Sequence, residues 1–303
     1  MRTALSGGKM KKAFGGTARK VWKTGRFGKN NPTVCLFIDW LYDRLEGMNV
    51  EHEFKGYALV LQDGADPLTT GGVAVAGFTT AGMVGVIAAS HIIQTLQLNQ
   101  LGTVLNAQFP AVALIHNEVP KHPVRVYQGD GIGVFTSEIQ FKDEQDIMFA
   151  STVLEWFTRG GFDRLIIIDG LVQSSKEVST GALFGVGSSQ EARDRLHRAG
   201  IEPIQQGIVA GITGFLLGEG DRLGIDVTAL LAEASPMYPD ARAAALAVEA
   251  VAELTGIEIP LSELLENAQN IEDSVRDVLE NSRTLLPGPD SEVYDQDIDP
   301  SFG

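Results

Sequence analysis

From about residue 58 onward, hydrophobic and polar positions follow two alternating patterns. Short, continuous apolar runs are typical of buried strands, and longer stretches with an apolar residue every three or four positions are typical of helices. The clearest apolar run, Leu165 to Ile168, ends in Asp169-Gly170. Because aliphatic residues continue through it without a polar position, it predicts an interior parallel strand that is covered on both faces.

The same patterns predict further strands and helices in an alternating order. Strands are expected at Val73 to Ala76, Thr103 to Leu105, Val112 to His116, Val124 to Tyr127, Gly131 to Phe135, Leu183 to Val186 and Val227 to Ala232. Helices are expected at Gly82 to Leu98, Asp143 to Thr158, Ser189 to Ala199, a segment that ends at Leu223, and Asp240 to Thr255. Because no linker divides them, the sequence predicts one α/β domain at 48–256, with helices on both faces of a mostly parallel or mixed sheet.

An amphipathic pattern follows this domain. Pro260 to Ser282 predicts a helix within a C-terminal segment, 257–283, and its polar face is acidic. Its apolar stripe consists of Leu261, Leu264, Leu265, Ala268, Ile271, Val275, Val278 and Leu279. A stripe with nearly heptad spacing can pack on the domain's own sheet or on another subunit, and both interpretations stay open. Residues 284–303 lack periodicity and are rich in proline, aspartate and glycine, so we expect a disordered acidic tail.

The first 47 residues differ from the rest in charge. They hold ten of the 24 lysines and arginines but three of the 39 acidic residues, so residues 48–303 carry 14 basic and 36 acidic side chains. We interpret residues 1–47 as a basic leader, which a mis-assigned start upstream of Met48 would explain. A basic arm that binds nucleic acid is the alternative. The helical spacing of Thr33 to Leu45 also leaves docking elsewhere on the protein open.

Composition narrows the classes of partner and compartment. The formal net charge is -15, and an acidic body repels nucleic acids and anionic membranes. Few of its basic residues are lysines, which indicates a protein suited to a salt-rich, halophilic cytoplasm. The single cysteine, Cys35, excludes an internal disulfide and fits a reducing compartment. Since no uninterrupted apolar stretch reaches the roughly 20 residues that a membrane helix needs, we expect no membrane span.

Two turns are punctuated by glycine, and each precedes a helical pattern. The first contains Gly77, Gly82 and Gly85, and the second contains Gly207, Gly211 and Gly214. Glycine at such turns allows either close packing of a helix on a sheet or close approach of a ligand, such as an anion at a helix N-terminus. The spacing matches neither GxGxxG nor GxxxxGK followed by Ser or Thr, so no nucleotide-binding fingerprint is present.

Candidate catalytic groups are few. No serine lies in a GxSxG motif, and the five histidines lack the spacing of a metal site, so we expect no metal and no cofactor. Asp169 is the strongest candidate acid, because α/β proteins bind ligands at the carboxyl ends of parallel strands. An aspartate before Gly170 is also typical of a turn cap, and that interpretation stays open. Glu138 follows Ser137 at the end of another expected strand and can face the same edge.

At these residues the chain resembles the PAC2 family, the proteasome assembly chaperones and their archaeal relatives, over roughly residues 58–282. The matching pieces occur in the family's order. They are Gly77-Phe78, Gly82 to Gly85 with Ala88-Ala89, Phe109 to Ala111, Arg125 to Tyr127, Ser137-Glu138, Asp169-Gly170, Gly207, Gly211, Gly214, Leu216-Leu217, Glu219 and Pro239-Asp240 before an alanine-rich helix. Their order is more specific than any single piece.

The resemblance implies a three-layer α/β/α fold similar to nucleoside phosphorylases, no catalysis, and a role in assembling the 20S proteasome. It also implies a cytoplasmic homo-oligomer that contacts proteasome α-subunits through protein surfaces. Some members end in a hydrophobic residue, tyrosine and any residue. This chain departs from that motif, because it ends in Ser301-Phe302-Gly303 and Val293-Tyr294-Asp295 lies inside the tail. The alternative function is a small-molecule or nucleotide-binding enzyme that uses the glycine turns and the strand-end acids.

Overall fold

The computed structural model describes residues 50–54, 57–62, 71–106, 109–116, 118–141, 143–172, 181–236 and 238–266. The chain divides into two compact units, Met1–Gly47 and Met48–Gly303, and every described residue belongs to the second. The expected basic leader, most of the C-terminal helix and the acidic tail with both of its aromatic motifs lie outside the described residues.

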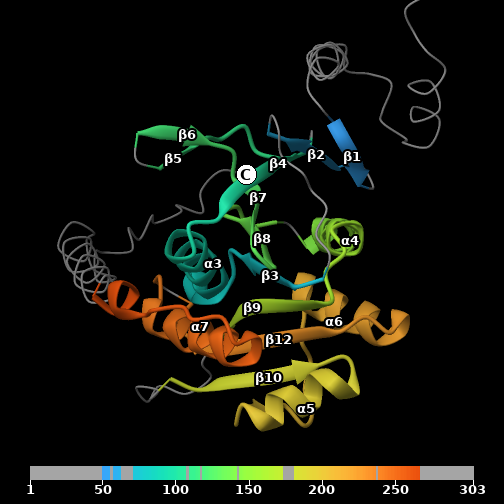
Figure 1. Ribbon diagram of the computed structural model, residues 1–303, viewed down its shortest axis with the longest axis vertical. Helices are drawn as coiled ribbons and strands as arrows, with labels where there is room; N and C mark the ends of the chain where they lie inside the picture. The colour runs from blue at the N-terminus through green and yellow to red at the C-terminus, as the bar shows by residue number, and fades with distance from the viewer. Residues whose placement is uncertain are drawn as a thin grey trace, which may run out of the picture. The chain divides into compact units, whose positions relative to one another are not determined.

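The described residues form a ten-stranded mixed sheet (Figure 1). Its strands lie in the order β1 (Val50–Phe54), β2 (Tyr57–Leu61), β4 (Asn99–Leu105), β7 (Val124–Gly129), β8 (Ile132–Ser137), β3 (Val73–Phe78), β9 (Arg164–Val172), β12 (Val227–Ala234), β10 (Leu183–Gly187) and β11 (Glu202–Pro203). The four middle strands β8, β3, β9 and β12 run parallel. The pairs from β1 to β8 are antiparallel, as is β12 with β10, whereas β10 and β11 are parallel. The expected mixed sheet is therefore confirmed.

Strand β9 lies between two parallel partners, β3 and β12. Its residues Leu165 to Ile168 are buried, as the apolar run predicts. The strand does not end there, however, because backbone pairing with β12 continues as far as Val172, which pairs with Ala234. The expectation that Asp169 stands at the end of its strand is therefore wrong, and Asp169 lies inside β9.

Two hydrophobic cores lie on opposite faces of the sheet. In the described part of the chain the helices are α3 (Val84–Thr95), α4 (Asp143–Arg159), α5 (Gln190–Arg198), α6 (Gly211–Leu223) and α7 (Ala241–Thr255). Helices α3 and α7 contribute to the core that contains Ile166, and α4 and α6 contribute to the core that contains Ile167. Because neighbouring residues of a strand point to opposite faces, β9 supplies side chains to both cores.

The helix ends follow local signals in the sequence. Ser189 precedes α5, and its side chain accepts a hydrogen bond from the N–H of Ala192 at 3.0 Å. Asp240 precedes α7 and accepts one from the N–H of Ala243 at 2.9 Å. Gly256 ends α7 in the left-handed conformation that glycine adopts readily. These residues satisfy backbone groups that the helix cannot pair itself.

Helix α3 differs from the expected span of Gly82 to Leu98. A short 3-10 turn, η1 (Ala81–Met83), precedes the helix, and within it Gly82 has a φ of 60° and Met83 a φ of 51°. Helix α3 therefore begins at Val84. The helix ends at Thr95. Left-handed backbone cannot be part of a right-handed helix, and this explains the later start.

The beginning of the expected C-terminal helix packs on the domain itself. Residues 262–266 are helical, Leu264 is buried in the core beneath α3 and α7, and Leu265 is half exposed. His91 of α3 is buried, and its Nε2 atom lies 2.8 Å from the carbonyl oxygen of Pro260. The remaining stripe residues lie outside the described residues. Among the helices that the structure describes, none combines the length and the apolar character needed to cross a membrane.

Tyr57 of β2 is buried with its hydroxyl group unpaired. Its side chain is 1 % exposed, and its ring contacts Phe109 and Phe149. The hydroxyl oxygen has no hydrogen-bond partner in the part of the chain that the structure describes. Burial raises the pKa of Tyr57 to about 12, because the phenolate would lose its hydration.

We expect Tyr57→Phe to keep or raise the free energy of unfolding at neutral pH, by up to about 1 kcal/mol, since it removes a buried unpaired hydroxyl. In the parent chain, the free energy of unfolding falls as the pH rises from 10 toward 12, because in that window Tyr57 ionises in the unfolded chain but stays protonated in the folded one. Urea unfolding at neutral pH and at about pH 11 measures both effects. The variant should lose less stability than the parent between the two; an equal loss would contradict the burial of an uncharged phenol.

Candidate functional site

The first glycine turn connects β3 to α3 at the carboxyl ends of the central strands. A Cβ atom on Gly77 would lie 2.1 Å from the carbonyl oxygen of Gly85, and one on Gly85 would lie 2.5 Å from the carbonyl oxygen of Ile168 in β9. Gly82 has a positive φ, and its Cβ would lie 2.6 Å from that of Ala234. These distances are shorter than real Cβ contacts, so the three glycines allow α3 to lie directly on the sheet. The geometry favours the packing interpretation of this turn.

Asp169 is partly buried, and both of its carboxylate oxygens accept hydrogen bonds. Oδ1 accepts a hydrogen bond from the N–H of Gly170 at 2.7 Å, and Oδ2 accepts one from Oγ1 of Thr213 at 2.6 Å. A Cβ on Gly170 would lie 2.0 Å from the carbonyl oxygen of Ala81, so this strand position also needs glycine. Because Thr213 belongs to α6, this hydrogen bond connects α6 to β9.

Glu138 follows β8 and serves as the counter-ion of a buried arginine. Its Oε1 accepts a hydrogen bond from Nη2 of Arg125, and its Oε2 lies 3.1 Å from Nε2 of His116. Arg125 is 4 % exposed and also donates to the hydroxyl of Tyr127 at 2.8 Å and to the carbonyl oxygen of His122 at 2.6 Å. A buried guanidinium needs such an acid, and this need explains why Glu138 faces Arg125.

The second glycine turn forms the exposed loop before α6. Gly207 and Gly211 are exposed, and Gly211 has a φ of 66°. A Cβ on Gly214 would lie 2.1 Å from the carbonyl oxygen of Val209. Gly211 therefore supplies the left-handed backbone at the start of α6, and Gly214 allows the loop to fold back onto the first turn of that helix.

The N-terminal ends of α4 and α6 lie side by side. A Cβ on Gly211 would be 3.4 Å from Oδ2 of Asp146, which belongs to the first turn of α4. Burial raises the pKa of Asp146, and the neighbouring Asp143 raises it further. The two helices therefore start together, with the carboxylate of Asp146 beside Gly211.

The structure brings most of the expected site residues to one edge of the sheet, toward the carboxyl ends of its central strands. This edge carries Gly77, Gly82, Gly85, Glu138, Asp169 and Gly170, and the Asp169–Thr213 hydrogen bond connects it to the helix that contains Gly211 and Gly214. The described residues include no group of three or more His, Cys, Asp and Glu that could hold a metal ion. Chemically, this arrangement holds α3, α6 and the sheet together.

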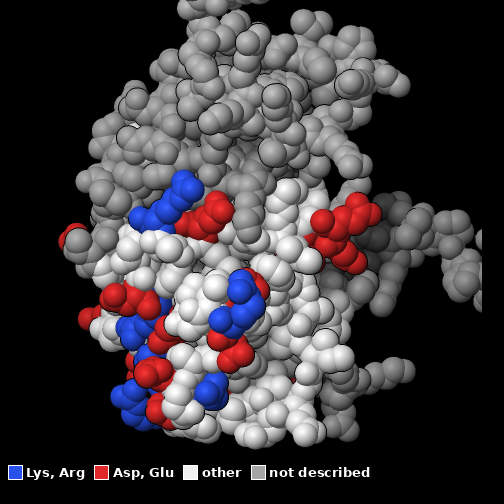
Figure 2. Space-filling view, turned by 90° about the vertical axis from the view of Figure 1, so that its right-hand side faces the viewer, with Lys and Arg blue, Asp and Glu red and all other residues white. Residues whose placement is uncertain are grey.

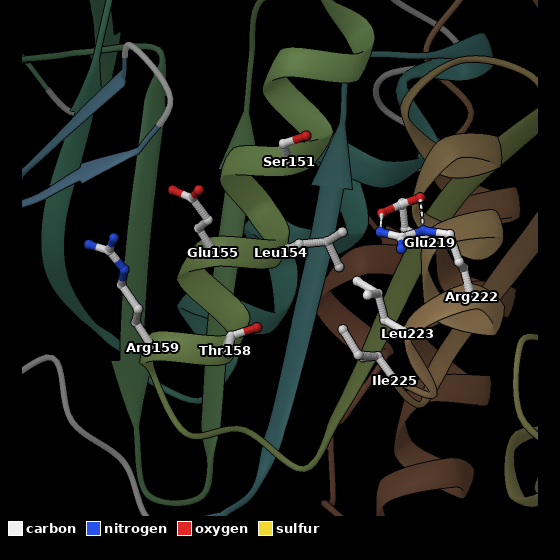
Figure 3. A pocket seen from close by; sticks show the side chains of 9 residues that line it. All are labelled: Ser151, Leu154, Glu155, Thr158, Arg159, Glu219, Arg222, Leu223 and Ile225. Atoms are coloured by element: carbon white, nitrogen blue, oxygen red, sulfur yellow. Dashed lines mark hydrogen bonds and ion pairs between the residues drawn. The ribbon is translucent and has the colours of Figure 1, made fainter.

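A groove of about 290 Å³ lies between the C-terminal halves of α4 and α6 (Figure 3). It is lined by Ser151, Leu154, Glu155, Thr158, Arg159, Glu219, Arg222, Leu223 and Ile225. Leu154 of α4 points across it toward α6, and Leu223 and Ile225 point back toward α4. On the α6 side, Arg222 forms an ion pair with Glu219 at 2.6 Å, and this hydrogen-bonded pair raises the pKa of Arg222. Apolar side chains thus lie between the two helices, and charged and hydroxyl side chains line the rest of the groove.

Apolar side chains are also exposed along the same two helices. Ile208, in the loop before α6, is 95 % exposed, Ile147 of α4 is 61 % exposed, and Leu223 at the end of α6 is 50 % exposed. Figure 2 looks onto the side of the molecule that carries α4 and α6, where charged side chains lie mainly at the left and centre, an acidic group lies at the right, and uncharged surface lies between them. An apolar groove with exposed apolar neighbours is typical of a protein-binding surface.

Sequence reasoning did not identify this surface. Its residues come from α4, α6 and the loop before α6, and their proximity depends on how two helices pack on one face of the sheet. The available signal was Ile208, a large apolar residue that directly follows Gly207 in a glycine-rich loop.

Known proteins match this chain over most of its length. The model of the PAC2 family matches residues 74–279. The crystal structure of Pyrococcus furiosus PbaA, described as an archaeal homolog of proteasome-assembly chaperone, superposes with a TM-score of 0.67 at 26 % identity, covering 76 % of this chain and 94 % of PbaA. Pyrococcus furiosus PbaB, described as an archaeal proteasome activator, has a TM-score of 0.62 at 22 % identity, covering 74 % and 99 % of the two chains.

An uncharacterized protein of Methanocaldococcus jannaschii is 24 % identical over 214 residues, which are 71 % of this chain and 88 % of that protein. The resemblance inferred from the glycine turns, Arg125 to Tyr127 and Asp169-Gly170 is confirmed by the family match. Because that match spans more than half of the sequence, from the second residue of β3 past the end of β12, the chain belongs to the PAC2 family.

Proposed function

We propose that this protein is an assembly chaperone of the 20S proteasome that binds α-subunits through protein surfaces, as a homo-oligomer in a salt-rich cytoplasm, without catalysis or a cofactor. The observation that carries the proposal is the exposure of Ile208 in the loop before α6, one of the two helices that line the groove. Similarity to PbaA, a homolog of proteasome-assembly chaperone, supports the class of partner.

The exposed residues favour a protein partner on energetic grounds. A single exposed aliphatic side chain is ordinary on a soluble protein. Ile147 of α4, Leu223 of α6 and Ile208 of the loop before α6, however, belong to one pair of packed helices and the loop that leads into it, and Leu223 also lines the groove. Burial of a side chain of this size in an interface contributes roughly 1.5 to 3 kcal/mol, which is the scale of a residue that dominates binding.

The alternative, a small-molecule or nucleotide-binding enzyme with a nucleoside-phosphorylase-like site, needs groups at the strand ends that can turn toward a ligand. Asp169 is engaged by Thr213 and Gly170, and Glu138 is engaged by Arg125. Breaking these contacts would cost the fold the hydrogen bonds described above. Titration calorimetry with nucleosides, nucleotides and phosphate tests this alternative, and saturable heat would support it.

We expect Ile208→Asp to weaken binding to proteasome α-subunits at least tenfold, or about 1.4 kcal/mol, because a charge would replace a buried apolar contact. The full chain is incubated with α-subunits from its own organism in high salt, and the dissociation constant is measured by biolayer interferometry. Val119→Asp is the matched control, since Val119 is also a half-exposed apolar residue but lies on a hairpin away from α4 and α6. Binding by the parent and the control but not by Ile208→Asp supports the proposal; equal binding by both variants contradicts the assigned surface, and no binding by the parent contradicts the function.

A further inference from the structure

A small hairpin, which we call the arm, forms a sheet of its own. It consists of β5 (Leu114–His116) and β6 (Val119–Lys121), and neither strand pairs with another strand among the described residues. Two residues connect the strands, and the second, Glu118, has a φ of 66°, as expected in a tight hairpin turn. A two-stranded hairpin is marginally stable alone in water, so its contacts with other parts of the protein or with a partner matter.

One face of the arm is tied to the main sheet. Nε2 of His116 lies 3.1 Å from Oε2 of Glu138, and Nζ of Lys121 donates a hydrogen bond to Oε1 of Gln100 at 3.2 Å. Side chains alternate along a strand, so Ile115 points to the opposite face. It is 66 % exposed, and its cross-strand neighbour Pro120 is also exposed. The arm is therefore held from one side and presents apolar groups on the other.

The two edges of the arm differ in their ability to pair with another strand. In a two-residue hairpin the closing residues, His116 and Val119, face each other with their backbone groups. The next pair, Ile115 and Pro120, then directs its backbone groups outward. Proline has no N–H, so the outer edge of β6 is blocked at that position, whereas Ile115 offers both an N–H and a carbonyl group at the outer edge of β5. The arm thus has one edge that can accept a strand.

The charge pattern indicates what can approach this edge. Residues 101–117 contain no Asp, Glu, Lys or Arg, in a chain with a net charge of -15. Two copies of so acidic a chain repel each other over most of their surface, and this repulsion is weaker at the arm, where Glu118 of the turn and Lys121 of β6 carry opposite charges. An antiparallel second copy of β5 can form hydrogen bonds along this edge, because the N–H and the carbonyl group of each Ile115 can pair with those of the other.

We propose that the β5 strands of two copies of this chain pair antiparallel about a two-fold axis at Ile115. The product is a four-stranded sheet in the order β6, β5, β5 and β6, with Leu114 of each copy opposite His116 of the other. Three-residue strands bury much less than the roughly 1,200 Å² of a stable interface, so this contact alone is weak and depends on concentration. It concerns self-association and does not depend on the proposed binding of proteasome subunits.

Cysteine cross-linking tests the pairing, even if it is weak. Facing residues of a hydrogen-bonded antiparallel pair have Cα atoms about 5.5 Å apart, which is within the range of a disulfide. In the full chain with Cys35→Ser, Ile115→Cys should form a covalent dimer under mild oxidation at least tenfold faster than Val119→Cys. Val119 is a half-exposed apolar residue of the same arm, but it lies on the blocked strand. Equal rates for the two variants, measured on non-reducing gels, would overturn the proposal.

Sedimentation equilibrium provides a second readout. Ile115→Asp would place two carboxylates opposite each other at the axis, so we expect it to weaken self-association at least tenfold, whereas Val119→Asp should not. Equal association of both variants and the parent would also overturn the proposal. Because binding of α-subunits is measured separately through Ile208, failure of the arm contact is distinguishable from failure of the proposed function.

Discussion

Gly85→Ala is expected to unfold the domain or to lower its free energy of unfolding by roughly 3 to 5 kcal/mol. The added methyl group would lie 2.5 Å from the carbonyl oxygen of Ile168 and within 2.9 Å of the backbone N and O of Phe78. All three contacts are with backbone atoms of central strands, which cannot rotate away as a side chain can. Such a loss is a large fraction of the 5 to 15 kcal/mol that typically stabilises a domain.

Gly218→Ala is the matched control, because it makes the same change in a helix where space is available. Gly218 lies in α6, is exposed, and a Cβ there would meet no atom within 4 Å. Alanine has the higher helix propensity, so this variant should gain about 0.5 to 1 kcal/mol. Thermal and urea unfolding of both variants measure the contrast; comparable stability of the two would refute direct contact between α3 and the sheet at Gly85.

Glu138→Ala is expected to cost about 3 kcal/mol, because it leaves the buried guanidinium of Arg125 without its acid. The cost is not a measure of what the pair contributes, since most of it is the penalty of an unpaired buried charge. The double variant Arg125→Met with Glu138→Ala should therefore recover part of the loss. Urea unfolding at neutral pH determines all three values.

The ion pair between Glu219 and Arg222 is the control for this effect. Arg222 is largely exposed, so Glu219→Ala should leave the unfolding midpoint almost unchanged. A loss as large as that of Glu138→Ala would show that burial does not distinguish the two pairs. If Glu138→Ala were also neutral, Arg125 would have to reach solvent, contrary to its position in the structure.

Much of the fold could be predicted because the central segments carry their own signals. The apolar run in β9, the N-cap Asp240 and the C-terminal Gly256 of α7 each define an element locally. The sequence patterns did not predict strands β1, β2, β6 and β11, and for the last two the reason is plain. Strand β6 contains Pro120, and β11 has only two residues, too few to show a period. Left-handed backbone at Met83 likewise has no signature in the sequence.

The sequence could predict which positions form the candidate site, but it could not predict whether each of them packs against the fold or binds a ligand. The sequence indicated that Gly85 and Asp169 matter, and the structure places them at one edge. Whether a glycine admits a ligand or a neighbouring strand depends on atoms from distant segments, such as the carbonyl of Ile168 beside Gly85. The hydrogen bond from Thr213 to Asp169 also joins segments far apart in sequence. Periodicity reports which side of an element is apolar, and it does not report what lies against that side.

The position of β3 in the sheet has a consequence for synthesis of the chain. Strand β3 is among the first to leave the ribosome, yet Val73 pairs with Ile132 on one side and with Arg164 on the other. Both edges of this apolar strand therefore stay open until β8 is made about sixty residues later, and the edge that pairs with β9 stays open for about ninety. Unpaired apolar strands of this kind associate readily with other nascent chains. A protein proposed to guide the assembly of others thus passes through a period in which it needs protection itself.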